Sequence, residues 1–123
     1  MIIVIGIDII EISRIEKVMN RTRSFIEKSF TDSEIQYFKS KGLKGNVIAG
    51  NFAAKEAISK AMGTGFRGFG LKDIEVLRDG LGKPIVNLSE KIYDLLDAKE
   101  FIMHISISHN KENAIAYAVM EAI

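Results

Sequence analysis

The sequence of 123 residues contains no cysteine. A disulfide framework, a thiolate metal site and a cysteine nucleophile are therefore excluded. The chain also lacks the marks of an exported or membrane protein. Its apolar start has no basic flank and is interrupted by Asp8, and no apolar run approaches the ~20 residues that span a bilayer. These absences predict a cytoplasmic location and no association with a membrane.

An excess of charge of one sign is also missing. The chain carries 17 basic and 16 acidic residues, for a net charge of +1, which argues against a general nucleic-acid binder. Hydrophobic residues make up 47% of the sequence, enough to build a core. The length predicts a single domain over residues 1–123. A domain of this size buries only about two-thirds of its unfolded surface, which leaves room for an oligomer.

The periodicity of the sequence predicts an α+β domain with one N-terminal strand, a helical middle and a mostly antiparallel sheet. The N-terminal run is β-branched almost throughout, which predicts a strand buried on both faces. A capping box opens the second helix, and four alanines favour close packing of a long central helix. The predicted strands cover residues 2–9, 73–78, 84–88, 101–108 and 114–121, and the predicted helices cover 11–19, 31–41, 46–62 and 89–98.

Two carboxylates stand in apolar surroundings. Asp8 interrupts the N-terminal strand, where an ionised carboxylate is costly unless it is paired or binds a metal; alternatively, it caps the following helix. Glu56 lies in the alanine-rich helix, where it could instead form a surface pair with Lys60 one turn later. Two oxygen ligands from different elements, completed by water and phosphate, are a common way to hold Mg²⁺. The sequence therefore permits a magnesium site that would bridge a diphosphate.

Two glycine-containing segments and one strand are candidates for anion binding. Residues 63–65 follow the central helix and residues 82–84 follow a turn; glycines let backbone amides approach anions, and Lys83 adds a charge. Each segment is also typical of an ordinary helix end or turn. His104 and Ser106 share one face of a strand, but the chain has no Gly-x-Ser-x-Gly nucleophile elbow, which argues against a serine hydrolase.

A basic stripe marks the first predicted helix. Arg14, Lys17 and Arg21 recur at helical spacing on one side of it. Such a stripe suits an acidic helical partner.

Five motifs together resemble the holo-[acyl-carrier-protein] synthases, which are 4′-phosphopantetheinyl transferases. They occur in the order and spacing of that family, and the resemblance runs from residue 5 to residue 121. The motifs are GIDIIEI at 6–12, FAAKEA at 52–57, SKAMGTG at 59–65, GKP at 82–84 and HISISH at 104–109.

The resemblance implies an activity and a set of roles. The family transfers 4′-phosphopantetheine from coenzyme A to a serine of apo acyl carrier protein and releases adenosine 3′,5′-bisphosphate. The resemblance implies that Asp8 and Glu56 hold Mg²⁺ and that Lys60 faces the diphosphate. Our own hypothesis is that Glu56 or a metal-ordered water is the base. The resemblance further implies a homotrimer with active sites between subunits and a carrier-docking first helix. The implied coenzyme A contacts are Lys60, Gly63, Thr64, Gly65, Lys83, Pro84, His104 and Ser106.

The chain departs from the family pattern at two positions. Asn51 stands where the family usually has an arginine before the FAAKEA motif, so a phosphate contact there is not carried over. Asn110 replaces a common threonine and remains a polar turn residue. Three rival interpretations are a non-catalytic coenzyme A or carrier-protein binding module, a coenzyme A-dependent acyltransferase that needs no Mg²⁺, and a nucleic-acid binder built on the basic helix.

Overall fold

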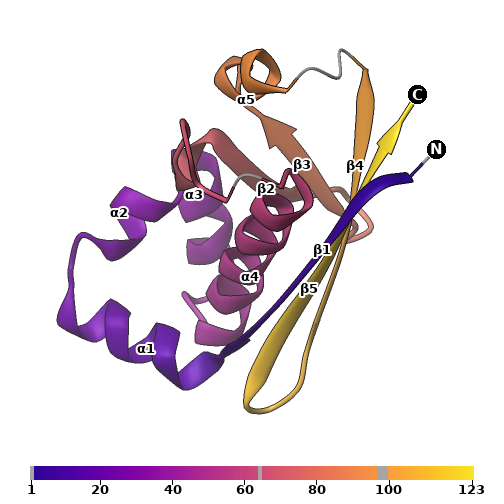
Figure 1. Cartoon of the computed structure of the whole chain (residues 1–123). Helices are drawn as coiled ribbons and strands as arrows, with labels where there is room; N and C mark the ends of the chain where they lie inside the picture. Colours follow the sequence, from indigo (N-terminus) through magenta and orange to yellow (C-terminus); the bar gives the residue numbers. More distant parts are fainter. Residues whose placement is uncertain (1, 64, 97–99) are drawn as a thin grey trace.

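The computed structural model describes residues 2–63, 65–96 and 100–123. It has the α+β architecture that the sequence predicts, with a helical middle between an N-terminal strand and a C-terminal hairpin (Figure 1). The elements are β1 (Ile2–Glu11), α1 (Ile12–Arg21), α2 (Phe25–Ser29), α3 (Asp32–Ser40), α4 (Gly45–Ala61), η1 (Leu71–Asp73), β2 (Ile74–Arg78), β3 (Pro84–Leu88), α5 (Glu90–Leu95), β4 (Phe101–His109) and β5 (Asn113–Ala122).

The strands form two antiparallel sheets. The larger sheet has the order β1-β5-β4, so the first strand of the chain pairs with the last. Asp8 lies opposite Ala116 of β5, and Ser106 of β4 lies opposite the neighbouring Tyr117. The smaller sheet is the β2-β3 hairpin, whose turn ends at Gly82 with a φ of 86°. The antiparallel pairing that the sequence predicts is confirmed in both sheets.

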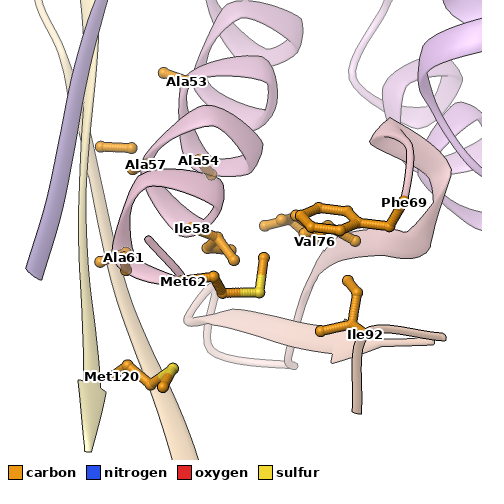
Figure 2. Close-up of a cluster of buried hydrophobic side chains, with 13 residues drawn as sticks. Ala53, Ala54, Ala57, Ile58, Ala61, Met62, Phe69, Val76, Ile92 and Met120 are labelled. Carbon is orange, nitrogen blue, oxygen red and sulfur yellow. The ribbon is translucent and has the colours of Figure 1, made fainter. Parts of the chain in front are cut away.

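The long helix α4 crosses the inner face of the larger sheet (Figure 1). Its alanines pack there with no exposed surface, as the composition of the helix predicts. Close contact depends on Gly6 of β1, because a Cβ at that position would lie 2.0 Å from the Ala57 carbonyl oxygen. On the other side of α4, Ile58 and Met62 point toward Phe69, Val76 and Ile92 (Figure 2). The central helix therefore packs against both sheets.

A second core joins α1, α2 and α3 to the start of α4. Phe30 and Phe38 are fully buried, and their rings meet edge to face with centroids 4.8 Å apart. The buried side of α1 contributes Ile12 and Ile15 to this cluster. This packing fixes α1 against the body of the protein and leaves its basic side toward solvent.

The structure differs from the sequence prediction in several local features. The short elements α2 and η1 were not predicted. The helix predicted for 89–98 is observed from Glu90 to Leu95, and the end of that prediction falls outside the described residues. Ser89 precedes this helix, but its hydroxyl donates a hydrogen bond to Asp73 Oδ1 at 2.8 Å rather than capping the helix.

The prediction that β1 is buried on both faces is wrong for the single chain. Ile5, Ile7 and Ile9 are 54%, 53% and 63% exposed on the outer face of the larger sheet. The apolar run reflects two kinds of surface, an inner face that packs on α4 and an outer face that the single chain leaves open. No helix within the described ranges is both long and apolar enough to cross a membrane.

Candidate active site

The carboxylate of Asp8 meets the last turn of α4. Strand alternation places Asp8 on the inner face of β1, two residues beyond Gly6, which allows the close approach of α4. Lys60 Nζ donates one hydrogen bond to Asp8 Oδ1 at 2.9 Å and another to the Ile7 carbonyl at 3.0 Å. The Asp8 side chain is 18% exposed and that of Lys60 is 53% exposed. The pair ties the strand to the helix while the lysine remains accessible.

Glu56 is the second carboxylate, one turn before Lys60 on α4. Burial raises the pKa of Glu56, the neighbouring Asp8 carboxylate raises it further, and Lys60 lowers it in smaller measure. In the part of the chain that the structure describes, Lys60 forms its hydrogen bonds with β1 and not with Glu56. The simple surface pair between Glu56 and Lys60 is therefore not formed among the described residues.

Asp8 and Glu56 line one cavity of about 340 Å³. Arg14 of α1 also lines it, and its remaining wall is largely apolar, with Phe25 and Phe52 from α2 and α4. Two carboxylates and a guanidinium thus face a space that is otherwise low in polarity. Electrostatic interactions with a bound anion or cation are stronger in such surroundings than in open water.

The donor set of this cavity fits Mg²⁺ bound together with a substrate phosphate. Among the residues that the structure describes, no group of three or more His, Cys, Asp or Glu side chains could enclose a metal ion. Magnesium does not need such a group, since it is usually held by one or two carboxylates and completed by waters and phosphate oxygens. A divalent ion would also relieve the repulsion between Asp8 and Glu56.

A second cavity, of about 460 Å³, lies between α4, β3 and β4. Lys83, Pro84 and Ser106, three residues predicted to contact coenzyme A, line it together. The turn before Lys83 is braced by Asp79, whose Oδ1 accepts hydrogen bonds from the backbone N–H groups of Leu81 and Lys83, both at 2.9 Å. The described residues that line this cavity include none of those lining the carboxylate cavity.

The structure does not bring His104 into this second cavity. His104 Nε2 lies 2.9 Å from Glu121 Oε1 on the outer face of the larger sheet, and this hydrogen bond lowers the pKa of Glu121. The contact of His104 with coenzyme A stays a prediction. Gly63 and Gly65 follow α4 with φ values of 78° and 60°, and Thr64 between them lies outside the described residues.

The basic stripe lies at the edge of the carboxylate cavity. Arg14, Lys17 and Arg21 are all exposed on α1, whereas Ile12 and Ile15 are buried against the core. Since Arg14 also lines the cavity, a partner that docks on this stripe would lie beside Asp8 and Glu56.

Among the polar residues that line the second cavity, sequence reasoning did not assign Tyr37, Arg78 or His109 to the site, although His109 ends the HISISH motif. They come from α3, β2 and the end of β4, so neither local spacing nor strand alternation links them. Asn51 was noted only as a departure, yet its fully buried side chain accepts a hydrogen bond from Arg78 Nη2 at 2.9 Å.

Comparison with known proteins gives one consistent result. The sequence profile of the 4′-phosphopantetheinyl transferase superfamily matches residues 4–118. A holo-[acyl-carrier-protein] synthase from Clostridium beijerinckii is 78% identical over all 123 residues, which cover 100% of both chains. A holo-(acyl-carrier-protein) synthase from Bacillus anthracis, solved in complex with CoA (3′,5′-ADP), is 45% identical with a TM-score of 0.83 and covers 100% of this chain and 99% of its own. The Helicobacter pylori holo-[acyl-carrier-protein] synthase, solved in complex with coenzyme A, is 37% identical with a TM-score of 0.82 and covers 95% of this chain and 99% of its own.

Proposed function

The chain belongs to the 4′-phosphopantetheinyl transferase superfamily, and we propose that it transfers 4′-phosphopantetheine from coenzyme A to a serine of apo acyl carrier protein. The observation that carries this proposal is the meeting of Asp8, Glu56 and Lys60 at one end of α4 beside the basic side of α1. In the reaction, the serine Oγ bonds to the phosphorus of the phosphopantetheinyl group, and the phosphoanhydride bond to the nucleotide breaks. Adenosine 3′,5′-bisphosphate leaves.

Asp8 and Glu56 are the proposed Mg²⁺ ligands. When bound, the ion would neutralise charge that develops on the diphosphate as the anhydride bond breaks. Lys60 provides a second positive charge at the same place. It is already oriented by the Ile7 carbonyl and Asp8, so its ammonium can face a phosphate oxygen without first being ordered.

The serine proton needs an acceptor, and Glu56 or an ordered water beside it is the proposed one. Glu56 lines the cavity next to Arg14, on the side where a carrier docked on α1 would present its serine. A base must come within hydrogen-bond reach of the proton that it removes. The place of Glu56 beside Arg14 of α1 supports this assignment.

The complete site is proposed to form between subunits of a homotrimer. The carboxylate cavity and the cavity that holds Lys83 and Ser106 share no lining residue among those described, yet one coenzyme A would have to reach both. The outer sheet face supplies an apolar surface for assembly, with Ile5, Ile7, Ile9 and Tyr117 each more than 40% exposed. We also place the reaction in the cytoplasm, because a chain without cysteine makes no use of an oxidising compartment.

Magnesium removal tests this proposal. Release of adenosine 3′,5′-bisphosphate from coenzyme A and apo carrier should cease in EDTA and return when excess Mg²⁺ is added. An acyltransferase acting on the thioester would need no metal, so product formation that survives EDTA would favour that alternative. A binding module would give no release in either condition.

A further inference from the structure

Arg78, which no sequence motif singled out, is held in a defined position in the second cavity. Its Nη2 donates to Asn51 Oδ1 at 2.9 Å, and its Nη1 donates to the Leu77 carbonyl at 3.2 Å. The guanidinium carbon lies 5.2 Å from the centre of the Tyr37 ring. An arginine fixed by two hydrogen bonds and a ring contact loses little further entropy when it binds a ligand.

Asn51 aligns this arginine without carrying a charge itself. Its Nδ2 donates to the Val76 carbonyl at 2.9 Å and to Glu34 Oε2 at 3.3 Å. Both partners are acceptors, so the amide must direct its nitrogen toward them and its oxygen toward Arg78. Since Asn51 is fully buried, the arrangement is fixed by the core, and Asn51 is a positioning residue for the guanidinium.

No carboxylate of the described residues pairs with Arg78 to neutralise its charge. The nearby Glu34 is already paired with Lys55 at 2.6 Å. Lys83 lines the same cavity, as does the imidazole of His109, and no carboxylate is among its described lining residues. The cavity therefore has an unbalanced positive charge and free N–H donors on a planar guanidinium, the arrangement that recognises phosphate.

The chemistry of the donor indicates which phosphate this is. Under the proposed function, on which this inference rests, the diphosphate lies with Asp8, Glu56 and Lys60. The remaining anion of coenzyme A is the phosphomonoester on the 3′ position of its ribose. We propose that Arg78, aligned by Asn51 and Tyr37, binds this 3′-phosphate and makes the enzyme select coenzyme A over dephospho-coenzyme A.

Isothermal titration of the full-length protein with coenzyme A and with dephospho-coenzyme A tests the assignment. In Arg78→Gln, affinity for coenzyme A should fall by roughly 10- to 100-fold, the usual worth of a charge-assisted phosphate contact. Affinity for dephospho-coenzyme A should change by less than about 2-fold, because that ligand lacks the group Arg78 contacts. Lys91→Gln, which removes one exposed charge on α5, should leave both affinities unchanged.

Two further variants separate binding from folding. Arg78→Lys keeps the charge and should recover part of the preference for coenzyme A. Adding Asn51→Ala to Arg78→Gln should produce little additional loss of coenzyme A affinity, because Asn51 acts through the guanidinium. Circular dichroism checks that each variant is folded.

If Arg78→Gln lowers the affinities for coenzyme A and dephospho-coenzyme A equally, or lowers neither, the assignment is overturned. Failure of this assignment and failure of the proposed function give different results. If wild-type protein transfers phosphopantetheine while Arg78→Gln leaves the preference for coenzyme A intact, only the role of Arg78 is refuted. If wild-type protein shows the predicted ligand pattern but transfers nothing to any apo carrier, the proposed function fails and the role of Arg78 in binding stands.

Discussion

At the residue scale, the buried charges of α4 matter as much as those exposed at the site. Lys55 precedes Glu56 in the chain but points the opposite way, into the core, where burial lowers its pKa against the opposing effect of Glu34. Its ammonium donates to Glu34 Oε1 at 2.6 Å and to the Ser29 and Leu71 carbonyls at 3.0 and 2.9 Å. This network connects α2, α3 and η1 to the helix that carries Glu56 and Lys60.

Replacing Lys55 by methionine should therefore destabilise the protein strongly. The substitution would leave the fully buried Glu34 carboxylate without its cation, which costs about 3–5 kcal/mol in free energy of unfolding. Urea denaturation at fixed protein concentration measures this, with Lys39→Met on the exposed side of α3 as the control. Adding Glu34→Gln should recover part of the loss. If the free energy of unfolding of Lys55→Met lies within about 1 kcal/mol of the wild-type value, the Lys55–Glu34 pair does not stabilise the fold as we expect.

Sequence alone can identify a residue of the site only when its partners lie near it in the chain. Sequence alone directs attention to Asp8 and Glu56, because an ionised carboxylate in an apolar run is costly unless it is paired or binds a metal; their role at the site stays a prediction. The partner of Lys60 was not predictable, since the i, i+4 pattern favours Glu56, and only the approach of β1 through Gly6 brings Asp8 within 2.9 Å. Arg78 and Asn51 are 27 positions apart in the chain, and no periodicity joins them.

At the element scale, α1 presents two different surfaces on opposite sides. Ile12 and Ile15 fix it to the core, and the exposed basic stripe faces outward beside the carboxylate cavity. The amphipathic pattern predicted this division, because the helical period separates the two sets of residues. The short α2 was missed because five residues carry too little periodicity to distinguish a helix from a loop.

Reversing charge on α1 should weaken carrier docking selectively. Lys17→Glu combined with Arg21→Glu leaves Arg14 in its cavity and should raise KM for apo carrier by roughly 10-fold or more, with kcat at saturation changed less than about 3-fold. Steady-state kinetics at low and moderate salt measures both constants. The difference in KM between the wild type and the double variant should decrease as the salt concentration increases.

Lys91→Glu on α5 is the matched control, since it reverses one exposed charge far along the chain from the stripe. An unchanged KM for the α1 double variant, or a loss confined to kcat, would show that the carrier docks elsewhere.

At the scale of the whole molecule, the outer face of the larger sheet is the feature that the single chain leaves unexplained. Apolar side chains alternate along β1 with the residues that pack on α4, and Ile5, Ile7 and Ile9 remain more than half exposed. The sequence predicted burial there, and assembly of three chains would supply it. The two separate cavities are a second argument for the proposed assembly, because one coenzyme A would have to reach both.

Ile7→Glu should yield a folded monomer with little transfer activity. A carboxylate in the centre of the outer face would have to be desolvated on assembly, and separated chains could not combine the two cavities. Light scattering measures the oligomeric state and circular dichroism the fold. Leu81→Glu, at a side chain that is 98% exposed, should leave assembly unchanged, and an active Ile7→Glu monomer would refute a site between subunits.

The central claim is that this chain transfers phosphopantetheine to a carrier serine. Its most direct test is the intact mass of apo acyl carrier protein after incubation with the enzyme, coenzyme A and Mg²⁺. The account predicts that the carrier gains one phosphopantetheinyl group, and that a carrier with alanine at the acceptor serine gains none. An unchanged mass for every apo carrier tested, with folded enzyme and Mg²⁺ present, would contradict it.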